Sequence, residues 1–88
     1  MRVIKGKEGC QCSFQDEFPE TLYCNCGGTA HIAFVAIEDE EDDNGYEPDG
    51  YICDLAPEDF KLWPHDACAV AVYFCKECME TMTEFNQA

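Results

Sequence analysis

Cysteines constrain this chain more than any other feature, because eight of its 88 residues are cysteine. Six of the eight fall in close pairs, which are Cys10 with Cys12, Cys24 with Cys26, and Cys75 with Cys78. One short turn can aim both thiolates of such a pair at a single point, and a tetrahedral metal such as Zn²⁺ needs two pairs of this kind. The other two cysteines, Cys53 and Cys68, stand alone.

The length of the chain predicts a single domain with a small core, which a metal or disulfide staple would help to stabilise. No apolar stretch follows the charged first seven residues, so we expect no signal peptide. Nor does any apolar run reach the ~20 residues that a membrane span needs. We therefore expect a cytoplasmic protein, in which paired cysteines indicate metal or redox chemistry rather than structural disulfides.

The charge is strongly unbalanced, with 19 acidic side chains against 5 Lys and Arg and a formal net charge of −14. Nucleic acids are polyanions that bind positive surfaces, so this charge argues against direct binding of DNA or RNA. The expected partner is a basic protein surface.

Two apolar segments predict strands. Residues 29–38 are apolar on both faces, so we expect a central strand. Its two predicted sets of side chains are Ile32, Phe34 and Ala36 on one face, and Val35 and Ile37 on the other. Residues 68–74 predict a second strand, with Val70, Val72 and Phe74 on one face and small residues with Tyr73 on the other.

Shorter patterns complete the expected fold. Val3 and Ile4 could form an edge strand, and Pro57 suits the first turn of a short helix. Met79, Met82 and Phe85 recur at helical intervals, so we predict a C-terminal helix.

The strongest pattern is Cys24-x-Cys26-Gly-Gly, then a strand, then a second strand that ends at Cys75-x-x-Cys78. It resembles a zinc ribbon, in which two cysteine knuckles joined by antiparallel strands share one Zn²⁺. The resemblance covers residues 24–78, although the first knuckle is Cys-x-Cys where the family more often has Cys-x-x-Cys. It implies that the zinc ligands are Cys24, Cys26, Cys75 and Cys78.

The expected fold class is therefore a small β-rich (α+β) domain stabilised by metal, with an antiparallel zinc-ribbon-like sheet and a C-terminal helix. Residues 1–88 would form this single domain, and residues 1–23 would be an N-terminal extension of the ribbon.

Cys68 cannot join the four-cysteine site, because seven residues of strand separate it from Cys75 by roughly 23 Å. A second zinc site at the other end of the sheet could draw on Cys10, Cys12, Cys53, His65 and Cys68. The chain would then bind two zinc ions rather than one. The alternative is that Cys53 and Cys68 pack in the core, while Cys10 and Cys12 are free or redox-active.

Other uses of the thiols remain open at this point. The two Cys-x-Cys pairs could form one site by themselves, which would leave Cys75 and Cys78 without partners. Cys24, Cys26, Cys75 and Cys78 could instead be reduced thiols that pack as small buried side chains. An iron–sulfur cluster is less well supported because the dense cysteine run of bacterial ferredoxins is absent. A redox Cys-x-x-Cys lacks its usual βαβ surroundings.

Three further features have both a structural and a functional interpretation. The acidic run Glu38–Asp43 is either a solvated loop or an acidic docking surface, and it does not fit the EF-hand template. His31 is either a strand residue or a metal ligand. Trp63 is either a core anchor or an interface residue.

These patterns predict a non-enzymatic, zinc-binding module that binds a basic protein. Four thiolates leave zinc no open position for a substrate, and no nucleophile triad or phosphate loop stands out. Two alternatives are an acidic inhibitor that imitates DNA and a redox or electron-transfer protein.

Overall fold

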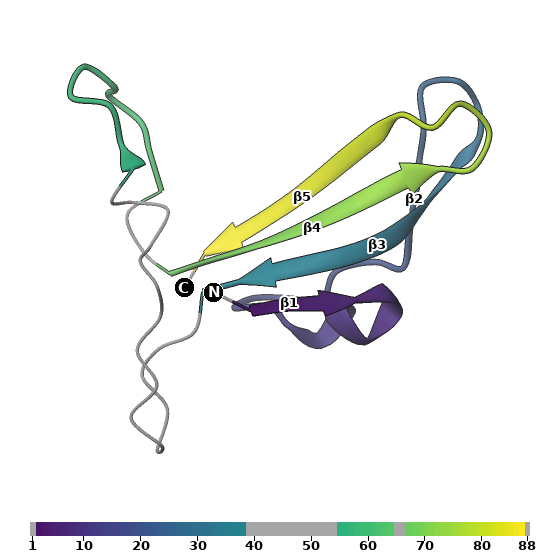
Figure 1. Cartoon of the computed structure of the whole chain (residues 1–88), viewed down its shortest axis with the longest axis horizontal. Helices are drawn as coiled ribbons and strands as arrows, with labels where there is room; N and C mark the ends of the chain where they lie inside the picture. Colours follow the sequence, from purple (N-terminus) through teal and green to yellow (C-terminus); the bar gives the residue numbers. More distant parts are fainter. Residues whose placement is uncertain (1, 39–54, 65–66, 88) are drawn as a thin grey trace.

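The computed structural model describes residues 2–38, 55–64 and 67–87, and its strands form one five-stranded antiparallel sheet. Strands β3 and β4 are central, β5 lies beyond β4, and β1 and β2 pair in succession with the other edge of β3 (Figure 1). In chain order the elements are β1 (Arg2–Lys5), the 3₁₀ helix η1 (Gly6–Gln11), β2 (Thr21–Tyr23), β3 (Thr29–Ile37), β4 (Cys68–Cys75) and β5 (Thr81–Gln87).

The predicted antiparallel, β-rich fold is confirmed, and so are the two long strands and the edge strand at Val3 and Ile4. The predicted C-terminal helix is wrong, because that segment forms β5 and pairs with β4 over its whole length. Met82 and Phe85 lie on opposite faces of β5. Their separation of three residues, which would place them on one face of a helix, therefore does not bring them together here. Met79 has a φ of 63°, which a helix interior excludes.

A β-bulge in β3 changes which of its side chains share a face. The register with β4 shifts between Ile32 and Phe34, so the extra residue Ala33 reverses the alternation along the strand. Ile32 and Val35 are therefore both buried on one face, while Phe34 lies on the other. The predicted grouping of Ile32 with Phe34 is wrong, and an alternating pattern could not reveal it because both faces are apolar.

One face of the sheet, here called the covered face, packs under residues 6–20. The strands contribute alanines, branched aliphatic side chains and one tyrosine to its core: Ala30, Ile32, Val35, Ile37, Ala69, Ala71 and Tyr73. Gly9 of η1 lies directly on Val35, because a Cβ at Gly9 would be 2.7 Å from Val35 Cγ2. Glycine is therefore what lets η1 approach the sheet so closely.

Two polar side chains fasten the N-terminal segment across the covered face. The Tyr73 hydroxyl donates a hydrogen bond of 2.6 Å to the Pro19 carbonyl. The Asn86 side chain accepts a bond of 3.2 Å from the Phe14 amide and donates one of 2.6 Å to Ser13 Oγ. The segment is thereby tied to both β4 and β5.

The opposite face, here called the open face, carries the larger apolar side chains of β4. The predicted division of β4 into two faces is confirmed, but the small residues and Tyr73 are the ones that form the core. Val70, Val72 and Phe74 are left half-buried or exposed among the residues that the structure describes.

Outside the sheet, Phe60 donates a backbone hydrogen bond of 3.1 Å to Pro57, which closes one turn rather than a helix. Glu38 is fully buried and donates its backbone amide to the Cys68 carbonyl, so this first acid of the predicted solvated run is not solvated. The rest of that run, Cys53 and His65 lie outside the described residues. No helix in the described ranges is long and apolar enough to cross a membrane.

Candidate metal centre

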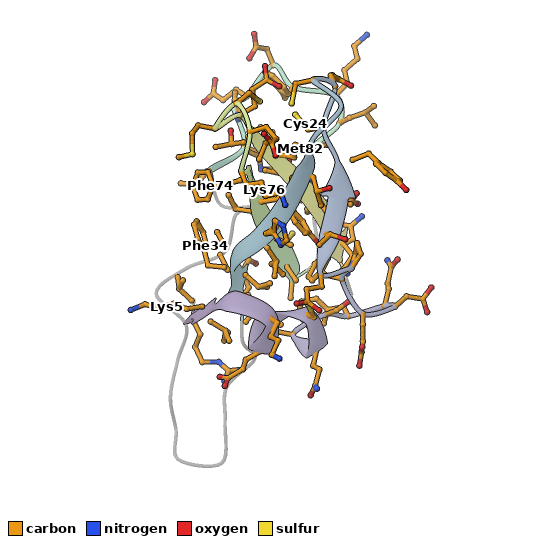
Figure 2. The ribbon with its side chains drawn as sticks, turned by 90° about the vertical axis from the view of Figure 1, so that its right-hand side faces the viewer. Lys5, Cys24, Phe34, Phe74, Lys76 and Met82 are labelled. Carbon is orange, nitrogen blue, oxygen red and sulfur yellow. The ribbon has the colours of Figure 1, made fainter. Side chains whose placement is uncertain are left out.

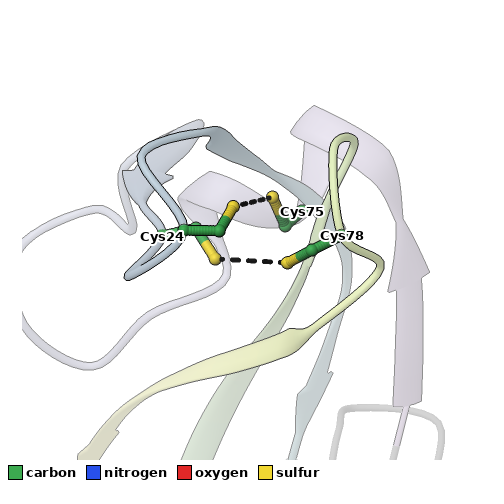
Figure 3. A group of neighbouring side chains, drawn as sticks. Cys24, Cys75 and Cys78 are labelled. Carbon is green, nitrogen blue, oxygen red and sulfur yellow. Dashed lines mark hydrogen bonds between the residues drawn. The ribbon is translucent and has the colours of Figure 1, made fainter.

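Four cysteine thiols meet at one end of the sheet (Figure 3). Cys24 and Cys26 follow β2, Cys75 is the last residue of β4, and Cys78 lies in the turn before β5. All four Sγ atoms lie within 4.8 Å of one another. Two Sγ–Sγ separations of 3.6 Å join Cys24 to Cys78 and Cys26 to Cys75, so each crosses between the two knuckles.

These distances suit a tetrahedral metal. Zinc holds thiolates at about 2.3 Å, which places the sulfurs about 3.8 Å apart around the ion. A disulfide would instead bring two sulfurs to about 2.05 Å, and the four thiols are free. The donor set is also one that zinc prefers, so these four residues could hold a Zn²⁺ ion.

The first knuckle depends on its two glycines. Gly27 has a φ of 91° and donates a hydrogen bond of 3.0 Å to the Cys24 carbonyl. A Cβ at Gly28 would lie 3.1 Å from Cys75 Sγ and 2.6 Å from Glu77 Cγ. Gly27 thus supplies the left-handed turn, and Gly28 leaves room for the opposite knuckle.

The second knuckle is a closed turn between β4 and β5. The Cys75 amide donates to the Glu80 carbonyl at 2.9 Å, and the Met79 amide donates to the Cys75 carbonyl at 3.0 Å. Met79 turns the chain with its positive φ. The Glu77 amide points at Cys75 Sγ from 3.4 Å, where it stabilises negative charge on the sulfur.

The site makes its thiols unequal. The backbone amides of Cys78 and Glu77 lower the pKa of Cys75 to about 7, in spite of its burial. The Cys26 amide lowers the pKa of Cys24, but burial and hydrogen bonds with the neighbouring thiols outweigh it and raise this pKa to about 12. Because sulfurs this close repel one another as thiolates, a bound cation would be needed to keep all four deprotonated.

Glu80 is a neighbour of the site that the cysteine spacing did not indicate. The Cys24 thiol donates to Glu80 Oε2 at 3.6 Å. Once Cys24 is a thiolate, the carboxylate and the sulfur are two adjacent negative charges. No sequence signal separates this glutamate from the other acids of the chain.

Exposure also differs within the group. Cys24 and Cys75 are buried, whereas Cys26 and Cys78 are exposed. The cluster therefore lies at the rim of the sheet, where a metal ion can enter from solvent past the two exposed sulfurs.

The remaining cysteines lie elsewhere. Cys68 is buried at the far end of β4, opposite Gln87, as its distance from Cys75 predicts. Cys10 and Cys12 are half-buried against the core. The alternative site made of the two Cys-x-Cys pairs is therefore wrong, because the partners of Cys24 and Cys26 come from the second knuckle.

Within the described ranges, the four-cysteine cluster is the one group of three or more close metal-ligating side chains. The second zinc site stays a prediction, because Cys53 and His65 fall outside those ranges. His31 is an exposed residue of β3, paired with Thr21 and Phe74, and does not belong to the cluster.

Comparison with known proteins adds no relative. The chain matches no protein-family model, no curated protein and no solved structure. The resemblance to a zinc ribbon therefore depends on the four-cysteine cluster and the antiparallel sheet that carries it.

Proposed function

We propose that Cys24, Cys26, Cys75 and Cys78 bind one structural Zn²⁺ and that the chain is a non-enzymatic module that binds a basic protein. The observation that carries the proposal is the cluster of four thiols, drawn from two knuckles far apart in the sequence. With all four positions taken by sulfur, zinc has no site for substrate and acts by holding the two knuckles together.

Zinc would supply stability that the core lacks. Ala30, Ala69 and Ala71 belong to the core of the covered face, and alanine buries little apolar area per residue. The metal would join the turn after β2 to the turn after β4, and so close that end of the sheet. Folding and metal binding would then be coupled.

The acidic surface supports the choice of a basic partner. Exposed acids gather on the N-terminal segment, where Glu8, Glu17 and Glu20 line a shallow hollow of about 370 Å³ with one lysine, Lys7. Negative charge concentrated in a concave surface attracts and orients a positively charged protein.

Elemental analysis of protein purified without chelator tests the metal. We expect about one zinc per chain, and loss of zinc or of folding in Cys24→Ser. Cys12→Ser is the matched control, because Cys12 lies outside the cluster and should leave one zinc bound. Less than about half an equivalent of zinc would contradict the site, and two equivalents falling to one in Cys12→Ser would add the second site. Iron with visible absorbance would favour electron transfer instead.

Affinity capture in a salt series tests the partner. A specific basic partner should bind the zinc-loaded protein at low ionic strength and be released as salt is raised. Cys24→Ser keeps the same acidic residues, so a partner that binds this unfolded variant equally well recognises charge alone. That result would contradict the proposed module.

A further inference from the structure

The open face of the sheet is an apolar surface that the site does not use. Two rows of paired residues cross β1, β3, β4 and β5 on this face. The first row is Val3, Ala36, Val70 and Phe85, and the second row is Lys5, Phe34, Val72 and Thr83. Phe74 adds a third aromatic ring, and Figure 2 shows Phe74, Phe34 and Lys5 along the same side of the sheet. Of these residues, Val3 is 58% exposed, Phe85 47% and Phe74 39%.

An antiparallel sheet with one solvated face normally carries polar side chains there. Here the outward positions Phe34 and Ala36 of β3, and Val70, Val72 and Phe74 of β4, are apolar instead. The apolar surface continues at one end, where Leu62, Trp63 and Pro64 lie beside Phe85, and Leu62 is 89% exposed. A contiguous apolar surface of this kind marks an interface rather than a surface adapted to water.

The charge of the open face differs from that of the whole chain. The chain has 19 acidic residues, yet no strand position on the described open face is acidic. Glu84 of β5 pairs with Ala71 and so lies on the covered side. Glu38, the residue after β3, follows Ala36 on the open side by alternation but is fully buried there. The charged groups at the outward positions are Lys5 and the titratable His31, which a basic partner could not use.

We propose that two copies of this chain pack open face against open face as a β-sandwich dimer. Two chains of net charge −14 repel each other, so we expect them to approach through a surface without carboxylates, and the described strand positions of the open face carry none. In a dimer with a two-fold axis, the same surface patch of each copy forms the interface. An apolar patch can pack against a second copy of itself in this way. The sheets would stack about 10 Å apart with their valines and phenylalanines between them.

The area of the open face indicates which class of interface two copies would form. Four strands about 4.8 Å apart, over about seven residues of 3.3 Å each, give roughly 400 Å² of flat area per copy. The pair would bury roughly 800 Å² or somewhat more, below the ~1,200–2,000 Å² of stable, specific interfaces. We therefore expect a weak, transient dimer rather than a permanent one.

Sedimentation equilibrium of the zinc-loaded protein, from about 5 to about 500 µM, tests the dimer. The mass should rise from one chain to two. The dissociation constant should fall at least about threefold between about 50 and about 500 mM NaCl, because salt screens the repulsion between the copies. Salt acts in the opposite direction on a basic partner, so the two associations cannot be confused.

Variants locate the interface. Phe85→Glu adds an acid to an exposed position of the open face and should weaken the dimer at least about tenfold. Gln11→Glu adds the same charge to η1 on the covered side and should have little effect. Val72→Thr keeps the branched shape of a strand residue and should weaken the dimer while the far-ultraviolet circular dichroism is unchanged.

Three results would overturn the dimer. One is a monomer at every concentration in high salt, and another is an association that salt weakens. The third is a dimer that neither Phe85→Glu nor Val72→Thr affects. Zinc content and capture of a basic partner are measured separately, so failure of the dimer leaves the proposed function standing and failure of the proposed function leaves the dimer testable.

Discussion

At the scale of single residues, the thiols of the knuckles could be predicted from spacing, but their neighbours could not. Two close cysteine pairs at strand ends indicated the cluster, and Gly27 and Gly28 indicated its tight turn. Glu80 comes within 3.6 Å of Cys24 only because the second turn folds back, and one acid among 19 carries no signal.

Glu80 gives a prediction about zinc affinity. In Glu80→Gln, a neutral amide that can donate to sulfur replaces a carboxylate that repels the Cys24 thiolate. We expect zinc to bind about 3- to 10-fold more tightly in competition with a chromophoric chelator. The backbone bond from Cys75 to the Glu80 carbonyl is unaffected. Equal or weaker affinity would show that the carboxylate turns away from the sulfur when metal binds.

Tyr73 gives a prediction about alkaline pH. Burial, followed by the nearby Cys10 and Glu84, raises the pKa of Tyr73 to about 12 from an ordinary value of about 10. Because the folded pKa exceeds the unfolded one, the neutral phenol stabilises the fold fully below about pH 10. That stability is lost as the pH rises through about 12.

Urea unfolding of zinc-loaded Tyr73→Phe measures this contribution. The variant should lose about 1 kcal/mol at neutral pH, with the bond to Pro19, and should then fall less steeply than wild type between about pH 10 and 12. The exposed Tyr23→Phe should keep the wild-type pH dependence. Parallel pH profiles for wild type and Tyr73→Phe would contradict a buried, titrating phenol.

At the scale of elements, length and composition identified β3 and β4, whose β-branched and aromatic residues span nearly the whole strand. β5 was predicted as a helix because the helical spacing of Met79, Met82 and Phe85 was preferred to the strand propensity of Thr81 and Thr83. The bulge at Ala33 could not be predicted from the sequence. A strand with apolar side chains on both faces shows no polar–apolar alternation that a bulge would interrupt.

The contact between η1 and β3 gives a prediction about packing. Gly9→Ala would place a methyl group 2.7 Å from Val35 Cγ2 and 3.1 Å from the Ile4 carbonyl oxygen. We expect a loss of about 1–3 kcal/mol in the free energy of unfolding. In a Val35→Ala background the clash with Cγ2 disappears, so the cost of Gly9→Ala should fall by about 1 kcal/mol or more. Additive costs in the double-mutant cycle would contradict the contact.

At the scale of the whole molecule, the sheet carries different chemistry at different places. The metal cluster lies at one end, the acidic N-terminal segment covers one face, and the strand positions described on the other face are largely apolar and include no acid. Composition predicted the acidity of the chain but not its uneven distribution, because that depends on which face the N-terminal segment covers.

The central claim is that four thiolates hold one zinc ion between the two knuckles. X-ray absorption at the zinc edge of the purified protein tests it most directly. We predict one zinc per chain with four sulfur neighbours at about 2.3 Å. Nitrogen or oxygen among the nearest neighbours, or fewer than four sulfurs, would contradict the assignment of Cys24, Cys26, Cys75 and Cys78 as its ligands.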